Sequence, residues 1–199
     1  MHNRKILIIG EVYVDQHLDI IENGYSTSRL GGIFHAARSC DALNIEYALA
    51  YYAPDYLVKD VEKFGIDVLR ASSIFRLGKV DKAPNVMLIG QSDESGNQLY
   101  ENILGRQAEY VSMLPFMQVL DDFDPTDIII FPGRYGNAGI LSNLSNYEGK
   151  IHIDMNYDCD DILDLDTIKI QTVFLSTSST SFEEFFKEIS YDNLIKYFD

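Results

Sequence analysis

The chain has 199 residues, of which 46% are hydrophobic and 24% are charged, so it can bury a core of its own. Its 31 acidic and 16 basic residues give a formal net charge of −15, which disfavours nucleic acid and anionic membranes as partners. The two cysteines, Cys40 and Cys159, form no metal-binding motif and fit a reducing compartment. We therefore expect a cytoplasmic protein with no export signal and no membrane span.

Apolar runs of strand length alternate with segments of helical periodicity along the chain. Strands are expected at 5–9, 46–51, 127–131, 151–155 and 172–176, and helices at 33–43, 56–64, 109–120, 136–147 and 180–189. This order predicts a mainly parallel sheet with helices on both faces. No repeat or linker-like tract interrupts the pattern, so residues 1–199 are expected to form a single α/β domain.

Two segments, 17–29 and 74–103, break the alternation. Both carry alternating polar and apolar residues around turn sequences, which is typical of antiparallel strands and hairpins. We interpret them as a small β-flap attached to the α/β body. A sheet of two to four strands leaves an apolar face uncovered, so a homodimer through the flap, or a partner subunit, is expected.

A carboxylate follows the first strand at a position where ligands often bind. The sequence KILIIGEVYVD runs from a buried strand through Gly10 to Asp15, five positions later. Ligands of open parallel sheets bind beyond the carboxyl ends of the strands, and a carboxylate there can accept hydrogen bonds from two adjacent hydroxyls. The alternative is a solvated turn residue, and in either case Asp15 is expected near solvent. Neither GxGxxG nor GxxxxGK[ST] is present in the sequence.

A glycine pair, Gly31 and Gly32, stands directly before the helix expected at 33–43. Glycine has poor helix propensity and no capping side chain, so its presence indicates that a backbone or a ligand passes close by. The alternative is a tight turn between the flap and the helix.

Together, GEVYVD and LGGIFHAARSCDALN resemble the N-terminal half of the ribokinase-like (PfkB) family of sugar and nucleoside kinases. The resemblance implies a mainly parallel sheet with helices on both faces and a small β-flap, or lid. It also implies that Asp15 binds substrate hydroxyls and that Gly31 and Gly32 are the family's glycine pair. His35 stands where the family usually has an Asn. The segment Asp154-Met155-Asn156 resembles a strand of the family that ends in Asp-Pro-Asn, so Asn156 matches the last residue of that strand.

The catalytic parts of that family lie in its C-terminal half, on a Gly-Ala-Gly-Asp turn whose Asp is the base. This sequence has no such turn, and Ser178 and Ser181 stand where the family carries an Asn and a Glu. No catalytic residue is therefore assigned, and ATP and Mg²⁺ are expected only if a C-terminal half is supplied. Two functions stay open: the acceptor side of a sugar or nucleoside kinase, and a non-catalytic ligand-sensing or assembly subunit.

Acidic clusters at 121–127 and 158–166 match no EF-hand loop, because DCDDILDLDTIK lacks the central Gly and the terminal Glu. We interpret them as solvated acidic faces and assign no metal.

Overall fold

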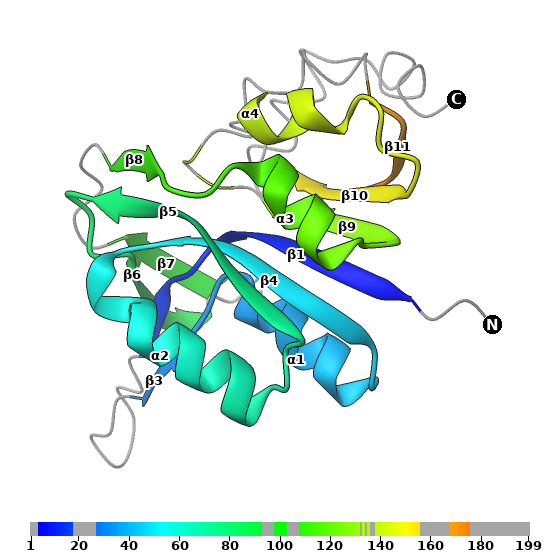
Figure 1. The fold of residues 1–199 in the computed structure, drawn as a ribbon. Coiled ribbons are helices and arrows are strands. Elements are labelled where there is room, and N and C mark those ends of the chain that lie inside the picture. The colour runs from blue at the N-terminus through cyan, green and yellow to red at the C-terminus, as the bar shows by residue number, and fades with distance from the viewer. Residues whose placement is uncertain are drawn as a thin grey trace.

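The computed structural model describes residues 4–17, 27–92, 98–102, 108–131, 133, 135, 138–155 and 168–175. These ranges form a large sheet with helices on both faces and a small sheet near the carboxyl ends of two central strands (Figure 1). Three expected features lie outside the described residues: the helix at 180–189, the acidic cluster at 158–166, and residues 18–26 and 93–97 of the two flap segments.

Within the described ranges, the large sheet has seven strands in the order β11-β10-β9-β1-β4-β5-β8. Their bounds are β1 Lys5–Glu11, β4 Glu46–Ala53, β5 Ser73–Asp81, β8 Glu109–Ser112, β9 Asp127–Ile130, β10 Lys150–Met155 and β11 Ile170–Leu175. All neighbouring strands run parallel except β8, which is antiparallel to β5. The five strands expected from apolar runs and the mainly parallel sheet are thus confirmed.

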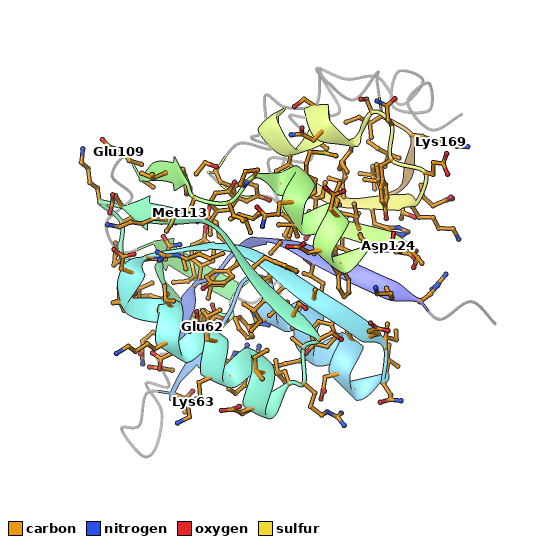
Figure 2. All side chains as sticks on the ribbon, in the orientation of Figure 1. Glu62, Lys63, Glu109, Met113, Asp124 and Lys169 are labelled. Atoms are coloured by element: carbon orange, nitrogen blue, oxygen red, sulfur yellow. The ribbon has the colours of Figure 1, made fainter. Side chains whose placement is uncertain are left out.

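Helices cover both faces of this sheet, and their apolar sides form two cores (Figure 1, Figure 2). One face carries α1 Phe34–Ala42 and α2 Val58–Lys63, which continues into a π-helical turn Phe64–Val68; the other carries α3 Phe116–Phe123 and α4 Ala138–Leu141. Short 3₁₀ turns at Asp55–Leu57 and Ser142–Leu144 adjoin α2 and α4. No helix in the described ranges is long and apolar enough to cross a membrane.

One expected helix is wrong in its first half. Residues 109–112 of the segment 109–120 form strand β8 on the edge of β5, and the helix begins only at Phe116, after Pro115. Pro115 is extended, with φ −60° and ψ 132°, and a proline ring suits the start of a helix but not its interior. Residues 109–112 pair with the open edge of β5, a partner that the helical periodicity of the sequence does not reveal.

The small sheet, which we call the flap, has the strand order β3-β2-β6-β7. Its strands are β2 Val14–His17, β3 Thr27–Leu30, β6 Val86–Ser92 and β7 Gln98–Asn102. Strand β2 is parallel to β6 and antiparallel to β3, and β6 is antiparallel to β7. Two boundaries differ from expectation. Strand β5 pairs in the large sheet, so the second flap segment starts later than residue 74, and the first begins at Val14.

Candidate functional site

Asp15 lies in flap strand β2, opposite Arg29 of β3, and is only 4% exposed. Its Oδ2 atom is 3.0 Å from Nε2 of His35 and 3.6 Å from Nε of Arg29. Both partner side chains are half exposed. Among the described residues, no hydrogen-bond donor approaches Oδ1 of Asp15. The expectation that Asp15 lies near solvent is wrong, because pairing within the flap folds its carboxylate against the start of α1.

The glycine pair makes two close approaches within the chain. A Cβ on Gly31 would overlap the carboxylate of Asp15, and one on Gly32 would overlap the carbonyl oxygen of Glu11. Gly32 also has a φ of +61°, a conformation that side-chain-bearing residues seldom adopt. The N–H of Gly31 donates to the Tyr13 carbonyl at 2.8 Å, and that of Ile33 to the Glu11 carbonyl at 3.2 Å. The pair therefore fixes the flap to α1 and leaves room for the Asp15 carboxylate.

Glu11 is a buried carboxylate that sequence reasoning missed. It ends β1, is 1% exposed, and accepts hydrogen bonds from side chains that include, within the described part of the chain, those of Tyr13, Asn85 and Tyr110. Tyr13 and Tyr110 hydroxyls donate at 2.8 Å each, and the Asn85 amide donates at 3.2 Å. Asn85 also donates to the Val12 carbonyl at 3.1 Å. An acidic residue at the end of a buried apolar strand was the available signal, because such a group is seldom buried without partners.

Three tyrosines form a cluster next to Glu11. The Tyr52 and Tyr135 rings stack with centroids 4.8 Å apart and planes 11° apart. Tyr110 meets Tyr52 and Tyr135 edge-on, at 6.0 and 6.4 Å. Burial raises the pKa of Tyr52. Tyr52 lies near the carboxyl end of β4 and Tyr135 follows β9, so the cluster sits at the edge of the sheet where open α/β proteins bind ligands.

The overall fold of the chain is similar to that of solved structures of sugar kinases. A ribokinase from Giardia lamblia has a TM-score of 0.57 at 17% identity, over 84% of this chain and 56% of that one. An uncharacterized sugar kinase from Pyrococcus horikoshii has a TM-score of 0.55 at 13% identity, over 85% and 62%. A microbiome-derived acarbose kinase has a TM-score of 0.51 at 12% identity, over 93% and 66%.

The chain has a ribokinase-like fold. The family resemblance in the sequence is thereby confirmed at the level of the fold. The chain spans 62% of the length of the Pyrococcus kinase and 56% of the Giardia ribokinase. No protein-family profile matches the sequence, and no curated protein does.

In this ribokinase-like fold, the structure brings together Asp15, Gly31, Gly32 and His35 at the base of the flap. Asn156 lies outside the described residues. Asp154, two residues earlier, lies in β10, where burial raises the pKa of the carboxyl group.

The acidic cluster at 121–127 divides by environment. Asp121, Asp122 and Asp124 are exposed, whereas Asp127 is buried with Oδ1 3.4 Å from Nε2 of His152. Within the described part of the chain, no group of three or more His, Cys, Asp or Glu side chains is placed to hold a metal ion.

Proposed function

We propose that this chain binds a small polyhydroxy ligand, a sugar or nucleoside, at the base of the flap, as the acceptor side of a carbohydrate kinase. The observation that carries the proposal is the Asp15 carboxylate, which lies over Gly31 where the flap meets α1. The ribokinase-like fold, shared with sugar kinases, supports it.

The contacts of Asp15 suit the recognition of two adjacent hydroxyls. Oδ1 has spare acceptor capacity among the described residues, and Oδ2 shares its capacity with the half-exposed ring of His35. In this proposal a ligand hydroxyl takes the place of His35 at Oδ2, since half of the His35 side chain is exposed to solvent. Arg29 remains beside the carboxylate and offsets the cost of its burial.

Replacing Asp15 by Asn tests the binding site. The Asn side chain keeps the shape of Asp15 but removes the charge, so hydrogen bonds to ligand hydroxyls lose about 1.5–3 kcal/mol. Affinity for the best ligand is expected to fall roughly 10- to 150-fold. The ligand is first identified by thermal shift with a panel of sugars and nucleosides, and affinities are then measured by calorimetry.

Asp41→Asn is the matched control, because Asp41 pairs with Arg70 at 2.9 Å and does not contact Asp15. It is expected to bind the ligand as the parent does. Equal affinity of parent and Asp15→Asn would show that the carboxylate takes no part in binding.

The same proposal predicts that the 199-residue chain alone transfers no phosphate from ATP to its ligand. Phosphoryl transfer needs a base for the hydroxyl proton and donors for the charge on the transferred group. The sequence has no Gly-Ala-Gly-Asp turn to supply them. A coupled assay for ADP, run with purified protein and the ligand found above, is expected to give no ligand-dependent signal. Ligand-dependent ADP formation would contradict the prediction.

A second candidate function is a non-catalytic ligand-sensing or assembly subunit. Ser178 and Ser181, at positions where the resembled family carries an Asn and a Glu, favour it. Reading the gene beyond the codon for Asp199 separates the two candidates. An in-frame or adjacent segment with a glycine-rich turn and an Asp supports the kinase.

We further infer that two copies associate through the flap, in the cytoplasm. Within the described flap, β3 and β7 are edge strands, and open edges of this kind readily pair with another chain. Sedimentation at micromolar concentration is expected to give the mass of a dimer. A sharply monomeric mass would contradict the inference.

A further inference from the structure

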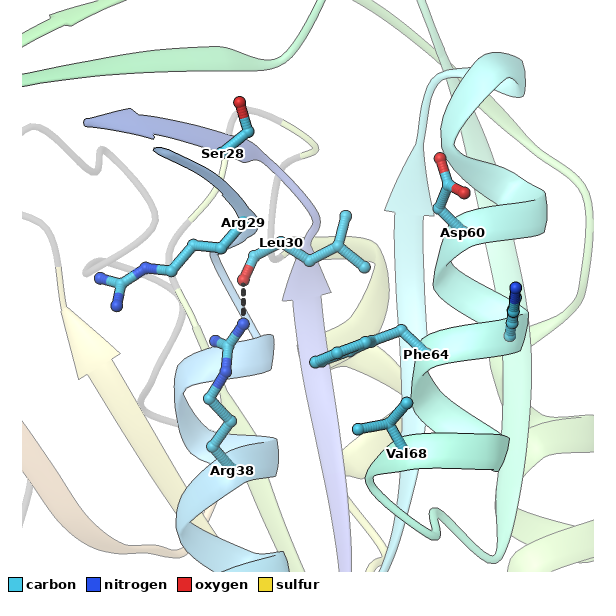
Figure 3. Close-up of a pocket in the computed structure, with 8 residues that line it drawn as sticks. Ser28, Arg29, Leu30, Arg38, Asp60, Phe64 and Val68 are labelled. Carbon is cyan, nitrogen blue, oxygen red and sulfur yellow. Dashed lines mark hydrogen bonds between the residues drawn. The ribbon is translucent and has the colours of Figure 1, made fainter. Parts of the chain in front are cut away.

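A separate cavity of 330 Å³ lies between flap strand β3 and helices α1 and α2 (Figure 3). Asp15 and His35 do not line it, and Arg29 is the residue that it shares with the site at the base of the flap. The cavity is therefore a distinct place at which a ligand can bind.

Cationic residues are part of the lining of this cavity although the whole chain has a formal net charge of −15. Arg29 comes from β3, Arg38 from α1 and Lys63 from the end of α2. Asp60 is the acidic residue among the described residues of the lining. The Arg29 guanidinium lies 3.6 Å from the Asp15 carboxylate and points away from Phe64 and Val68 (Figure 3), so its charge is largely offset. Arg38 and Lys63 against Asp60 leave a small positive excess, which favours an anion at this point of an acidic chain.

Arg38 has unused hydrogen-bonding capacity. Its Nη2 donates to the Leu30 carbonyl at 2.7 Å, drawn as a dashed line in Figure 3. Its Nη1 is buried and, among the described residues, has no hydrogen-bond partner. Burial and the nearby Arg29 guanidinium lower the pKa of Arg38, while Asp15 raises it. A bound oxyanion beside Arg38 would offset the repulsion between the two guanidinium groups.

The rest of the lining is apolar. Phe64 and Val68 begin and end the π-helical turn after α2, and both point toward the cavity beside Leu30 (Figure 3). The guanidinium carbon of Arg38 lies 5.6 Å from the centroid of the Phe64 ring. Val68 is 53% exposed, which leaves its surface available to an occupant. π-Helical turns of this kind often occur at functional sites.

We propose that this cavity binds a small organic oxyanion. The apolar body of the ligand lies against Leu30, Phe64 and Val68. Its carboxylate or phosphate group lies against Arg38, with Lys63 adding charge. Mainly apolar walls with a few convergent charged groups are the usual make-up of small-molecule sites.

Titration of the purified chain with phenyl phosphate and with benzoate, at constant ionic strength, tests the proposal. Saturable binding of at least one of them is expected, with NMR amide shifts centred on residues 28–30 and 64–68. Benzyl alcohol, which lacks the charge, and inorganic phosphate, which lacks the apolar body, are expected to bind at least tenfold more weakly. The stronger of the two aromatic anions identifies the head group that the site prefers.

Two substitutions and one control localise the binding. Arg38→Gln is expected to weaken it at least tenfold and Lys63→Gln at least threefold. Lys59→Gln removes the same charge from an exposed position of α2 outside the lining, and is expected to leave the affinity unchanged. Lys63 is exposed, so its substitution gives a result even if Arg38→Gln impairs folding.

Three results would overturn the proposal: no saturable binding of either aromatic anion, equal binding of benzyl alcohol, or equal weakening by Lys59→Gln and Lys63→Gln.

Discussion

Replacing Glu11 by Ala is expected to lower the free energy of unfolding by about 3 kcal/mol or more. The carboxylate is buried and accepts hydrogen bonds from Tyr13, Asn85 and Tyr110. These donors join the end of β1 to the start of the flap, to the segment before β6 and to edge strand β8. Hydrogen bonds to a charged group are stronger than average. The substitution by Ala removes the carboxylate that these donors share, at a position that water does not reach.

Urea denaturation followed by circular dichroism measures this loss. Glu11→Gln keeps the shape and part of the acceptor capacity, so it is expected to fall between the parent and Glu11→Ala. Glu62→Ala, on the exposed side of α2, is expected to change stability by less than about 0.5 kcal/mol. A loss below about 1 kcal/mol for Glu11→Ala would mean that the network contributes little.

Gly32→Val is expected to cost at least about 3 kcal/mol of stability and to abolish ligand binding at the base of the flap. The backbone at Gly32 has a φ of +61°, which a β-branched residue tolerates poorly. The new Cβ would also overlap the carbonyl oxygen of Glu11, which accepts the N–H of Ile33. Relief of this overlap requires the start of α1 to move away from β1, and with it His35 and the backbone beneath Asp15.

Gly139→Ala is the matched control in the same chain. Gly139 lies in α4, and a Cβ there would meet nothing within 4 Å. The substitution is expected to stabilise the protein by roughly 0.5–1 kcal/mol, because alanine loses less conformational freedom in a helix than glycine does. If Gly32→Val unfolds at the same denaturant concentration as the parent, backbone strain and overlap at Gly32 do not limit the stability of the protein.

The sequence by itself determined the elements whose signal is local. Continuous apolar runs marked β1, β4 and β9, because a parallel strand covered on both faces carries no polar alternation. Their alternation with helical periodicity predicted the mainly parallel sheet. The glycine pair indicated a close approach, with a tight turn as the alternative, because glycine has neither a Cβ nor a capping side chain. The resemblance to sugar and nucleoside kinases rested on two short segments, GEVYVD at the end of β1 and LGGIFHAARSCDALN around the glycine pair.

The tertiary structure alone decided which partner each strand and side chain meets. Strand β8 formed where helical periodicity was expected, because the edge of β5 was open to it. Asp15 became buried because β2 turned into the flap and placed it over Gly31. Glu11 gained Asn85 and Tyr110 from 74 and 99 residues further along the chain. Contacts between such distant residues depend on how whole elements pack, and no local period in the sequence encodes them.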